Sequence, residues 1–188
     1  PAPPAPADRA PPAPADGPRT LTAAFGANVY VSKNTTSNDA NSGESLDLAK
    51  ATIQAAVTAA AAGDTVLVDD GVYTASSGDY IADVGKAIVL RSLHGSEAVT
   101  LDGNHVRRNL RLSVAGAVAK ELTLYRGYSM GAWNSPSAVM VQGGRLENCI
   151  VDSPKGTSAN NAGVRLESGI VTGCILRNGT TTGASAGS

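Results

Sequence analysis

The sequence predicts an all-β protein folded as a parallel β-helix, a solenoid of stacked coils, with an N-terminal α-helical cap. The main observation is a repeat: Val139–Ser153 returns as Val164–Asn178, with Cys149 aligned on Cys174 at a spacing of 25 residues. A period of this length with short strands is typical of a β-solenoid. The second observation is that the apolar segments are too closely spaced for helical crossovers, which excludes a doubly wound α/β fold. A sandwich of hairpins is disfavoured by the repeat.

Residues 1–20 are expected to form a disordered Pro/Ala-rich linker ahead of a β-helix domain at 28–188. Proline fixes φ and removes backbone donors, so this stretch favours an extended, solvated chain. It is either a spacer that tethers the domain or a disordered tail without a function. The domain is expected to begin with a strand at Asn28–Ser32, followed by a loop at Lys33–Ser45.

An Ala-rich segment at Leu46–Ala62 predicts the cap helix, with Ser45 as its N-cap and Gly63 at its end. Apolar residues at helical spacing form one stripe, made of Leu46, Ala49, Ile53, Ala56, Val57 and Ala60. The first coil of a solenoid has an open end with unpaired backbone groups, and this helix is suited to cover it.

The coils are expected over residues 64–188, with more coils after Ser188 in the natural chain. The predicted strands are short apolar segments: Thr65–Val68, Ile88–Arg91, Val99–Leu101, Leu110–Val114, Leu122–Leu124, Val139–Val141, Leu146–Val151, Val164–Leu166 and Ile170–Leu176. Coils in register would stack like on like, about 4.8 Å apart. The alignment then pairs Val139 with Val164, Val141 with Leu166, Leu146 with Val171, Ile150 with Ile175 and Val151 with Leu176.

Three further expectations follow from this register. Val118–Gly127 is a weaker upstream copy, in which Leu122 takes the place of the cysteine. Gly144 and Gly169 mark corners where the chain bends sharply. Cys149 and Cys174 stack on adjacent coils as reduced thiols, because in-register side chains hold their Cβ atoms about 4.8 Å apart, too far for a disulfide.

The amino-acid composition limits the classes of partner that the chain could bind. The net charge is −1, from 15 Lys and Arg against 16 Asp and Glu, which argues against nucleic-acid binding. No run approaches the roughly 20 apolar residues of a membrane span. Abundant Gly, Ser, Thr and Asn fit an extracellular or cell-surface protein, expected to be monomeric. The chain does not begin with Met and carries no signal segment, so a signal was removed or the start is truncated.

A basic cluster at Arg107, Arg111 and His105 is a candidate ligand site. If Arg107–Leu112 is a strand, both arginines share one face with Asn109 while Leu110 and Leu112 point inward. Outward arginines could clamp a uronate or a sulfate. The alternative is a solvated charged surface.

Two other groups are candidates. Tyr125, Tyr128 and Trp133 lie close together in a chain with only 4% aromatic residues, and exposed aromatic rings can stack on sugars. The alternative, which the residues favour, is that they cover a local apolar patch. Asp39, Asn41 and Glu44 offer oxygens to a possible Ca²⁺ ion, although the loop lacks a full calcium motif and such residues also form ordinary turns.

The chain contains five characteristic strings: YVS at Tyr30–Ser32, ATIQAAV at Ala51–Val57, GDTVLVDDGVY at Gly63–Tyr73, IVLRS at Ile88–Ser92 and TLDGN at Thr100–Asn104. They resemble the N-terminal part of bacterial right-handed parallel β-helix repeat proteins of the pectin-lyase-like superfamily. RLENCIVDS and GIVTGCILRN are similar to the superfamily's β-helix repeats. The resemblance implies the right-handed fold and, in the superfamily, polysaccharide lyases, hydrolases and non-catalytic surface proteins.

The NTD, GHG and RIK-like motifs of the polygalacturonase-like members are absent, and no calcium-dependent lyase motif is recognisable. Asp69-Asp70 lies in the GDTVLVDDGVY string, where the fold signature explains it. Two functions therefore stay open. One is a carbohydrate-active protein that binds, and through unidentified residues cleaves by β-elimination, an acidic polysaccharide. The other is a non-catalytic, adhesin-type surface repeat protein. No cofactor is required, and catalytic residues are unknown.

Overall fold

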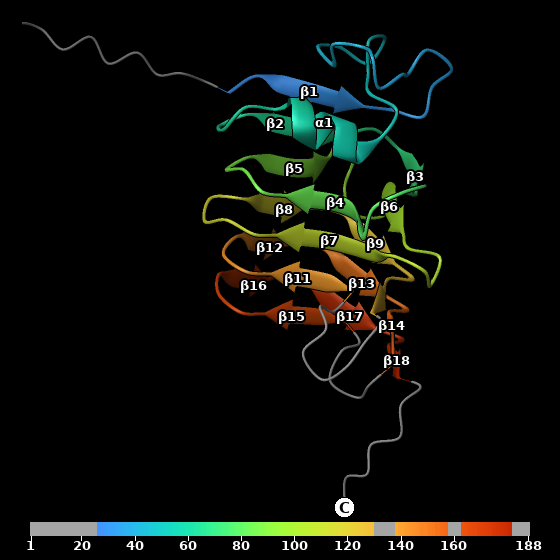
Figure 1. Ribbon diagram of the computed structural model, residues 1–188, viewed down its shortest axis with the longest axis vertical. Helices are drawn as coiled ribbons and strands as arrows, with labels where there is room; N and C mark the ends of the chain where they lie inside the picture. Colours follow the sequence, from blue (N-terminus) through green and yellow to red (C-terminus); the bar gives the residue numbers. More distant parts are fainter. Residues whose placement is uncertain (1–25, 130–137, 158–162, 182–188) are drawn as a thin grey trace, which may run out of the picture.

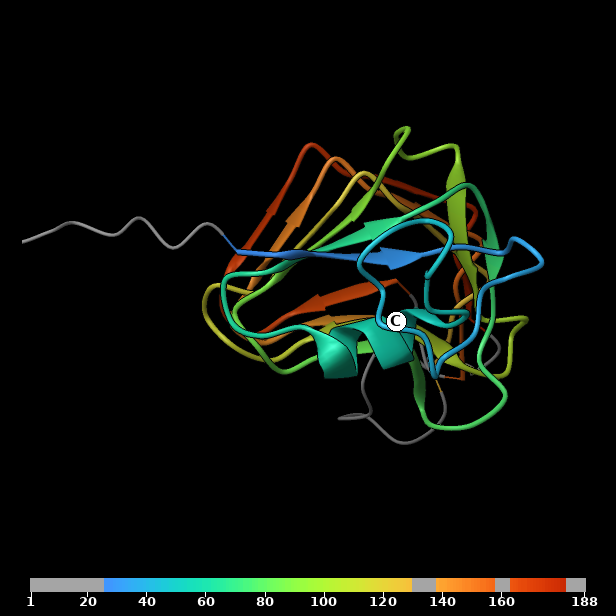
Figure 2. The ribbon, with the colours of Figure 1, turned by 90° about the horizontal axis from the view of Figure 1, so that it is seen from above.

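The computed structural model describes residues 26–129, 138–157 and 163–181, and all the strand pairs in these ranges are parallel. The strands form four sheets along a stack of about four coils (Figure 1). Viewed down the stack, strands of successive coils overlie one another (Figure 2). The predicted parallel β-solenoid is therefore confirmed. The linker at 1–20 lies outside the described residues.

We name the sheets A to D and give their strands in spatial order. Sheet A contains β1 (Asn28–Val31), β2 (Thr65–Val68), β5 (Val89–Ser92), β8 (Val118–Lys120), β12 (Arg145–Glu147) and β16 (Ile170–Thr172). Sheet B contains β17 (Ile175–Arg177), β13 (Ile150–Asp152), β9 (Thr123–Tyr125), β6 (Val99–Asp102) and β3 (Gly71–Tyr73). Sheet C contains β15 (Val164–Leu166), β11 (Val139–Val141), β7 (Arg108–Leu112) and β4 (Tyr80–Val84). Sheet D contains β10 (Tyr128–Ser129), β14 (Lys155–Gly156) and β18 (Thr180–Thr181).

The register between coils is the one that the repeat predicts. All five predicted pairs occur: Val139 with Val164, Val141 with Leu166, Leu146 with Val171, Ile150 with Ile175 and Val151 with Leu176. In-register stacking places apolar side chains directly above one another, as Leu90, Ala119 and Leu146 are in sheet A, and all three are buried. Each coil thus removes the inward face of its neighbour from water, which is the main source of stability in a solenoid.

Two predicted strands are each divided into two by a corner. Leu146–Val151 contains the end of β12 and the start of β13, and Ile170–Leu176 contains β16 and the start of β17. At the corners Asn148 has φ 51° and Gly173 has φ 62°, a left-handed conformation that Asn and Gly tolerate best. Gly144 and Gly169 lie at corners, as predicted, because each directly precedes a strand of sheet A, and Gly169 has φ 101°. A Cβ atom at Gly144 would lie 2.4 Å from the carbonyl oxygen of Ala117.

The helix α1 (Ile53–Ala59) is shorter at both ends than the predicted Leu46–Ala62, and its N-cap is Thr52 rather than Ser45. Tertiary contacts override the helical propensity of the alanines. At the N-terminal end, the amides of Ala51 and Thr52 donate to the carboxylate of Asp39, at 2.9 and 2.8 Å. At the other end, the amide of Ala61 donates to the Asp64 carboxylate at 2.8 Å.

The helix covers the first coil, as expected of a cap. Its buried residues Ile53, Ala56 and Val57 face a core to which β1, β2 and β4 contribute. The Gln54 side-chain oxygen accepts a hydrogen bond from the amide of Asp83 at 2.8 Å, on the edge strand β4. A backbone donor at the edge of sheet C therefore has a partner, which protects the edge.

Strand β7 begins at Arg108, one residue later than the strand predicted from Arg107. Leu110 and Leu112 point inward as predicted, but Asn109 is fully buried and does not share an outer face with the arginines. Its side-chain amide donates to the carbonyl oxygens of Leu101 and Tyr125, at 2.8 and 2.9 Å. Asn109 thus cross-links successive coils from within, because a buried amide requires partners that solvent would otherwise supply.

Cys149 and Cys174 occupy equivalent positions on adjacent coils, directly before the paired residues Ile150 and Ile175. Both thiols are free, as predicted. Cys149 is buried, whereas Cys174 is partly exposed.

Candidate functional site

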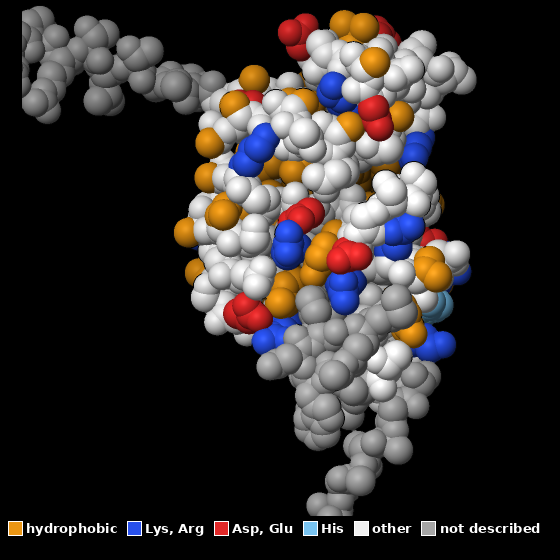
Figure 3. All heavy atoms as spheres, viewed as in Figure 1, with side chains coloured by type: hydrophobic (Ala, Val, Ile, Leu, Met, Phe, Trp, Pro, Cys, Tyr) orange, Lys and Arg blue, Asp and Glu red, His pale blue; other side chains and the backbone are white. Residues whose placement is uncertain are grey.

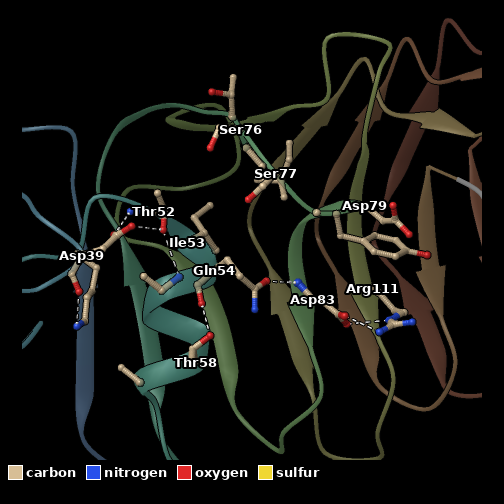
Figure 4. Close-up of a pocket in the computed structure, with 18 residues that line it drawn as sticks. Asp39, Thr52, Ile53, Gln54, Thr58, Ser76, Ser77, Asp79, Asp83 and Arg111 are labelled. Carbon is tan, nitrogen blue, oxygen red and sulfur yellow. Dashed lines mark hydrogen bonds and ion pairs between the residues drawn. The ribbon is translucent and has the colours of Figure 1, made fainter.

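A cleft of about 930 Å³, lined by polar and apolar residues, lies between α1 and the segment 74–79, beside β4. Figure 4 shows the helix residues on one side, Ser76 and Ser77 across from them, and the Asp83–Arg111 pair beyond. The polar residues lining the cleft are Asp39, Lys50, Thr52, Gln54, Thr58, Thr74, Ser76, Ser77, Asp79, Tyr80, Asp83 and Arg111. Hydroxyl, amide, carboxylate and cationic groups therefore converge on one concave surface.

The helix side of the cleft is held in place by hydrogen bonds. The Thr52 hydroxyl donates to the Asp39 carboxylate at 2.9 Å and accepts from the amide of Ala55 at 3.2 Å. The Thr58 hydroxyl donates to the carbonyl oxygen of Gln54 at 2.8 Å. Their geometry is therefore set before a ligand arrives, which lowers the entropic cost of binding.

The floor of the cleft carries a bidentate ion pair. Arg111 on β7 donates through Nε and Nη2 to the two carboxylate oxygens of Asp83 on β4, at 2.7 and 2.5 Å. This hydrogen bonding raises the pKa of Arg111 above its usual range. Both side chains remain more than one third exposed, so the pair contacts the cleft. Figure 3 shows acidic and basic side chains next to one another on the face that carries β4 and β7.

Arg107 fixes the opposite wall rather than the floor. Its guanidinium donates to the carbonyl oxygen of Ser76 at 2.8 Å and to that of Gly78. The segment 74–79 is thereby tied to the turn that precedes β7. Two of the predicted basic residues thus border the same region, but one supports its wall and the other lies on its floor.

Tyr80 lines the cleft and contacts two guanidinium groups. The guanidinium carbon atoms of Arg111 and Arg108 lie 5.3 and 5.5 Å from the centre of its ring, within range of cation–π attraction. Burial raises the pKa of the Tyr80 hydroxyl, and this hydroxyl has no hydrogen-bond partner within the described ranges. The ring therefore acts as a rigid support for the cationic side chains.

His105, Tyr125 and Tyr128 do not line this cleft. His105 is half-buried with φ 54°, and burial, followed by the charges of Lys155 and Arg126, lowers its pKa. The guanidinium carbon of Arg126 lies 5.0 Å from the centre of the Tyr125 ring. Tyr128 lines a second, smaller cleft of about 200 Å³ together with Arg107 and Arg108. Trp133 lies outside the described residues.

In the predicted calcium loop, Asp39 has another structural role. Its carboxylate accepts from two backbone amides and from the Thr52 hydroxyl, as described above. The Asn41 amide donates to the carbonyl oxygens of Thr36 and Ala49, at 3.0 and 3.1 Å, and Glu44 is exposed. Calcium binding by Asp39, Asn41 and Glu44 stays an untested prediction.

One cluster was missed from the sequence. Asp69, Asp70 and His94 form the one group of three potential metal ligands found in the part of the chain that the structure describes. His94 Nδ1 lies 2.7 Å from an Asp70 carboxylate oxygen. This hydrogen bond, and then the charge of Asp70, raise the pKa of His94. The signal that could have revealed it was the register of β2 on β5, which pairs Val68 with Ser92 and so places the following residues together.

The chain matches no protein-family model, no curated protein and no solved structure. Within the described ranges, no helix is long and apolar enough to cross a membrane.

Proposed function

We propose that this chain is an extracellular carbohydrate-binding protein with the architecture of the pectin-lyase-like superfamily, and that it holds a polysaccharide chain in the cleft beside α1. The observation that carries the proposal is the cleft itself, whose volume of about 930 Å³ falls within the range of ligand sites. Its lining is rich in hydroxyl, amide and carboxylate groups, the partners that sugar hydroxyls require.

The charge of the lining favours a ligand bound mainly through hydroxyl groups. Three carboxylates, on Asp39, Asp79 and Asp83, face two cations, on Lys50 and Arg111. Because Asp83 already accepts from Nε and Nη2 of Arg111, a uronate would have to share that guanidinium. The binding experiment below therefore compares acidic with neutral polysaccharides.

The proposal is binding without cleavage, as in a non-catalytic surface protein. β-Elimination requires a base next to a group that neutralises the uronate carboxylate. Arg111 is the cation on the cleft floor that could neutralise it, and Asp83 compensates that charge.

The test is affinity electrophoresis of the full chain in gels that contain polygalacturonate, alginate or a neutral β-glucan. Thr58, exposed on the wall of the cleft, is replaced by Trp to fill it. Thr180→Trp, at an exposed threonine on β18, is the matched control. We expect Thr58→Trp to weaken binding about tenfold or more, a change of roughly 1.4 kcal/mol, and Thr180→Trp to leave it unchanged.

Equal effects of the two variants, or no retardation by any of the three polysaccharides, would contradict the proposal. Incubation with polygalacturonate, alginate or chondroitin, followed by ultraviolet absorbance, tests cleavage. An increase from unsaturated products would show a lyase and refute the non-catalytic part.

A further inference from the structure

Three potential ligands, none of which lines the cleft beside α1, meet at one corner of the solenoid. Asp69 directly follows β2, Asp70 precedes β3, and His94 lies two residues after β5. Because β2 and β5 are parallel neighbours in register, these residues occupy the same corner of successive coils. One carboxylate oxygen from each aspartate and one imidazole nitrogen lie within 4.8 Å of one another.

The three side chains differ in how firmly they are held. The Asp69 carboxylate accepts a hydrogen bond from the Ser32 hydroxyl at 2.9 Å, and the Tyr73 hydroxyl donates to the Asp69 carbonyl oxygen at 2.8 Å. In contrast, the side chains of Asp70 and His94 are 59% and 61% exposed. The corner thus has one anchored ligand and two that can reorient without disturbing the core.

We propose that Asp69, Asp70 and His94 bind a divalent transition-metal ion of the zinc class. An imidazole nitrogen with two carboxylate oxygens suits zinc, whereas calcium and magnesium take oxygen ligands. Bonds of about 2.0–2.2 Å in tetrahedral geometry bring ligand atoms to about 3.4 Å apart. Rotation of the exposed His94 and Asp70 side chains closes the cluster from its present spacing, and water completes the coordination.

The supporting contacts resemble those around other metal ligands. A carboxylate that binds a metal is usually held by a further hydrogen bond, which orients it and reduces the cost of ordering it. Ser32 supplies this contact to Asp69 from β1's end, and Ser32 is itself buried. A bound metal must replace the hydrogen bond between His94 and Asp70. The competing explanation is that this hydrogen bond alone brings the two side chains together.

The experiment is isothermal titration of the full chain with zinc chloride. His94→Gln removes the imidazole ligand, and Asp69→Asn removes a carboxylate that takes no part in the His94–Asp70 pair. We expect each to weaken zinc binding about tenfold or more. The matched control is His105→Gln, at the second of the two histidines of the chain, which should bind zinc like the parent.

A readout on the unmodified chain keeps the test independent of how the variants fold. In NMR spectra, zinc should shift the imidazole signals of His94 and leave those of His105 in place. A Cys149→Ser, Cys174→Ser double variant separates thiol binding from the proposed site, and it should retain zinc binding. Binding that survives His94→Gln, that disappears in the double variant, or that leaves the His94 signals unmoved would overturn the proposal.

Discussion

The middle and the last described coils carry the same kind of residues in the same register, yet bury them very differently. In sheet B, Leu124, Val151 and Leu176 stack in one ladder. Leu124 and Val151 are fully buried, whereas Leu176 is 55% exposed. In the middle, each ladder position is covered by coils on both sides. Burial in this fold therefore depends on neighbouring coils rather than on the apolar character of the residue.

The other end of the stack shows a different solution. Above β4, the first strand of sheet C, the chain does not supply another strand but the helix α1. The helix contributes Ile53, Ala56 and Val57 to the core, and Gln54 accepts from the edge amide of Asp83. A covered end thus needs both an apolar face and a partner for the edge backbone.

The largest effect is expected from the ladder itself. Leu124→Ala should lower the free energy of unfolding by about 2–5 kcal/mol, because it leaves a cavity between coils. Leu176→Ala should lower it by less than about 1 kcal/mol, since half of that side chain already contacts water. Urea unfolding followed by circular dichroism measures both values. Similar losses for the two variants would show that Leu176 is covered in solution.

A smaller effect is expected at the capped end. Gln54→Ala leaves the Asp83 amide at the sheet edge without its partner and should cost about 1–3 kcal/mol. The control is Gln142→Ala, because the Gln142 amide donates to Glu167 at an exposed site and its loss should cost less than about 0.5 kcal/mol. The same urea titration applies. Equal stability of the two variants would show that the Gln54 hydrogen bond does not stabilise the sheet edge.

The third comparison concerns reactivity and changes stability little. A hydrogen bond from Cys149 lowers the pKa of the half-buried Cys174 thiol to about 6, whereas the hydrogen bond to Cys174 and burial raise the pKa of Cys149. Iodoacetamide should therefore alkylate Cys174 rapidly at neutral pH, with a rate that falls as the pH drops through about 6.

Cys149 should react only in denaturant, and Cys174→Ser should remove the fast phase. The measurement is mass spectrometry of timed samples. Alkylation of both thiols at one rate in the native protein would contradict the difference in burial between the two coils.

Several features of the candidate sites could not be read from local sequence. The alanines from Leu46 to Ala62 favour a longer helix, but Asp39 and Asp64 bind the backbone amides at its two ends. Asn109 reads as an outward residue by alternation, yet its amide lies inside because Leu101 and Tyr125 offer carbonyl oxygens there. The cleft and the Asp69–Asp70–His94 cluster combine residues from separate coils, and no local sequence motif indicates that these residues lie close together.

The repeat in the sequence was sufficient to predict the parallel solenoid and the register of the two coils that contain it. Identical spacing of apolar residues along the chain leaves one arrangement in which like stacks on like, so a local pattern specifies a long-range contact. Only the tertiary structure determined where the helix ends, which arginine lines the cleft and which aspartates lie next to a histidine. Those outcomes depend on hydrogen-bond partners that only the packed coils bring within reach.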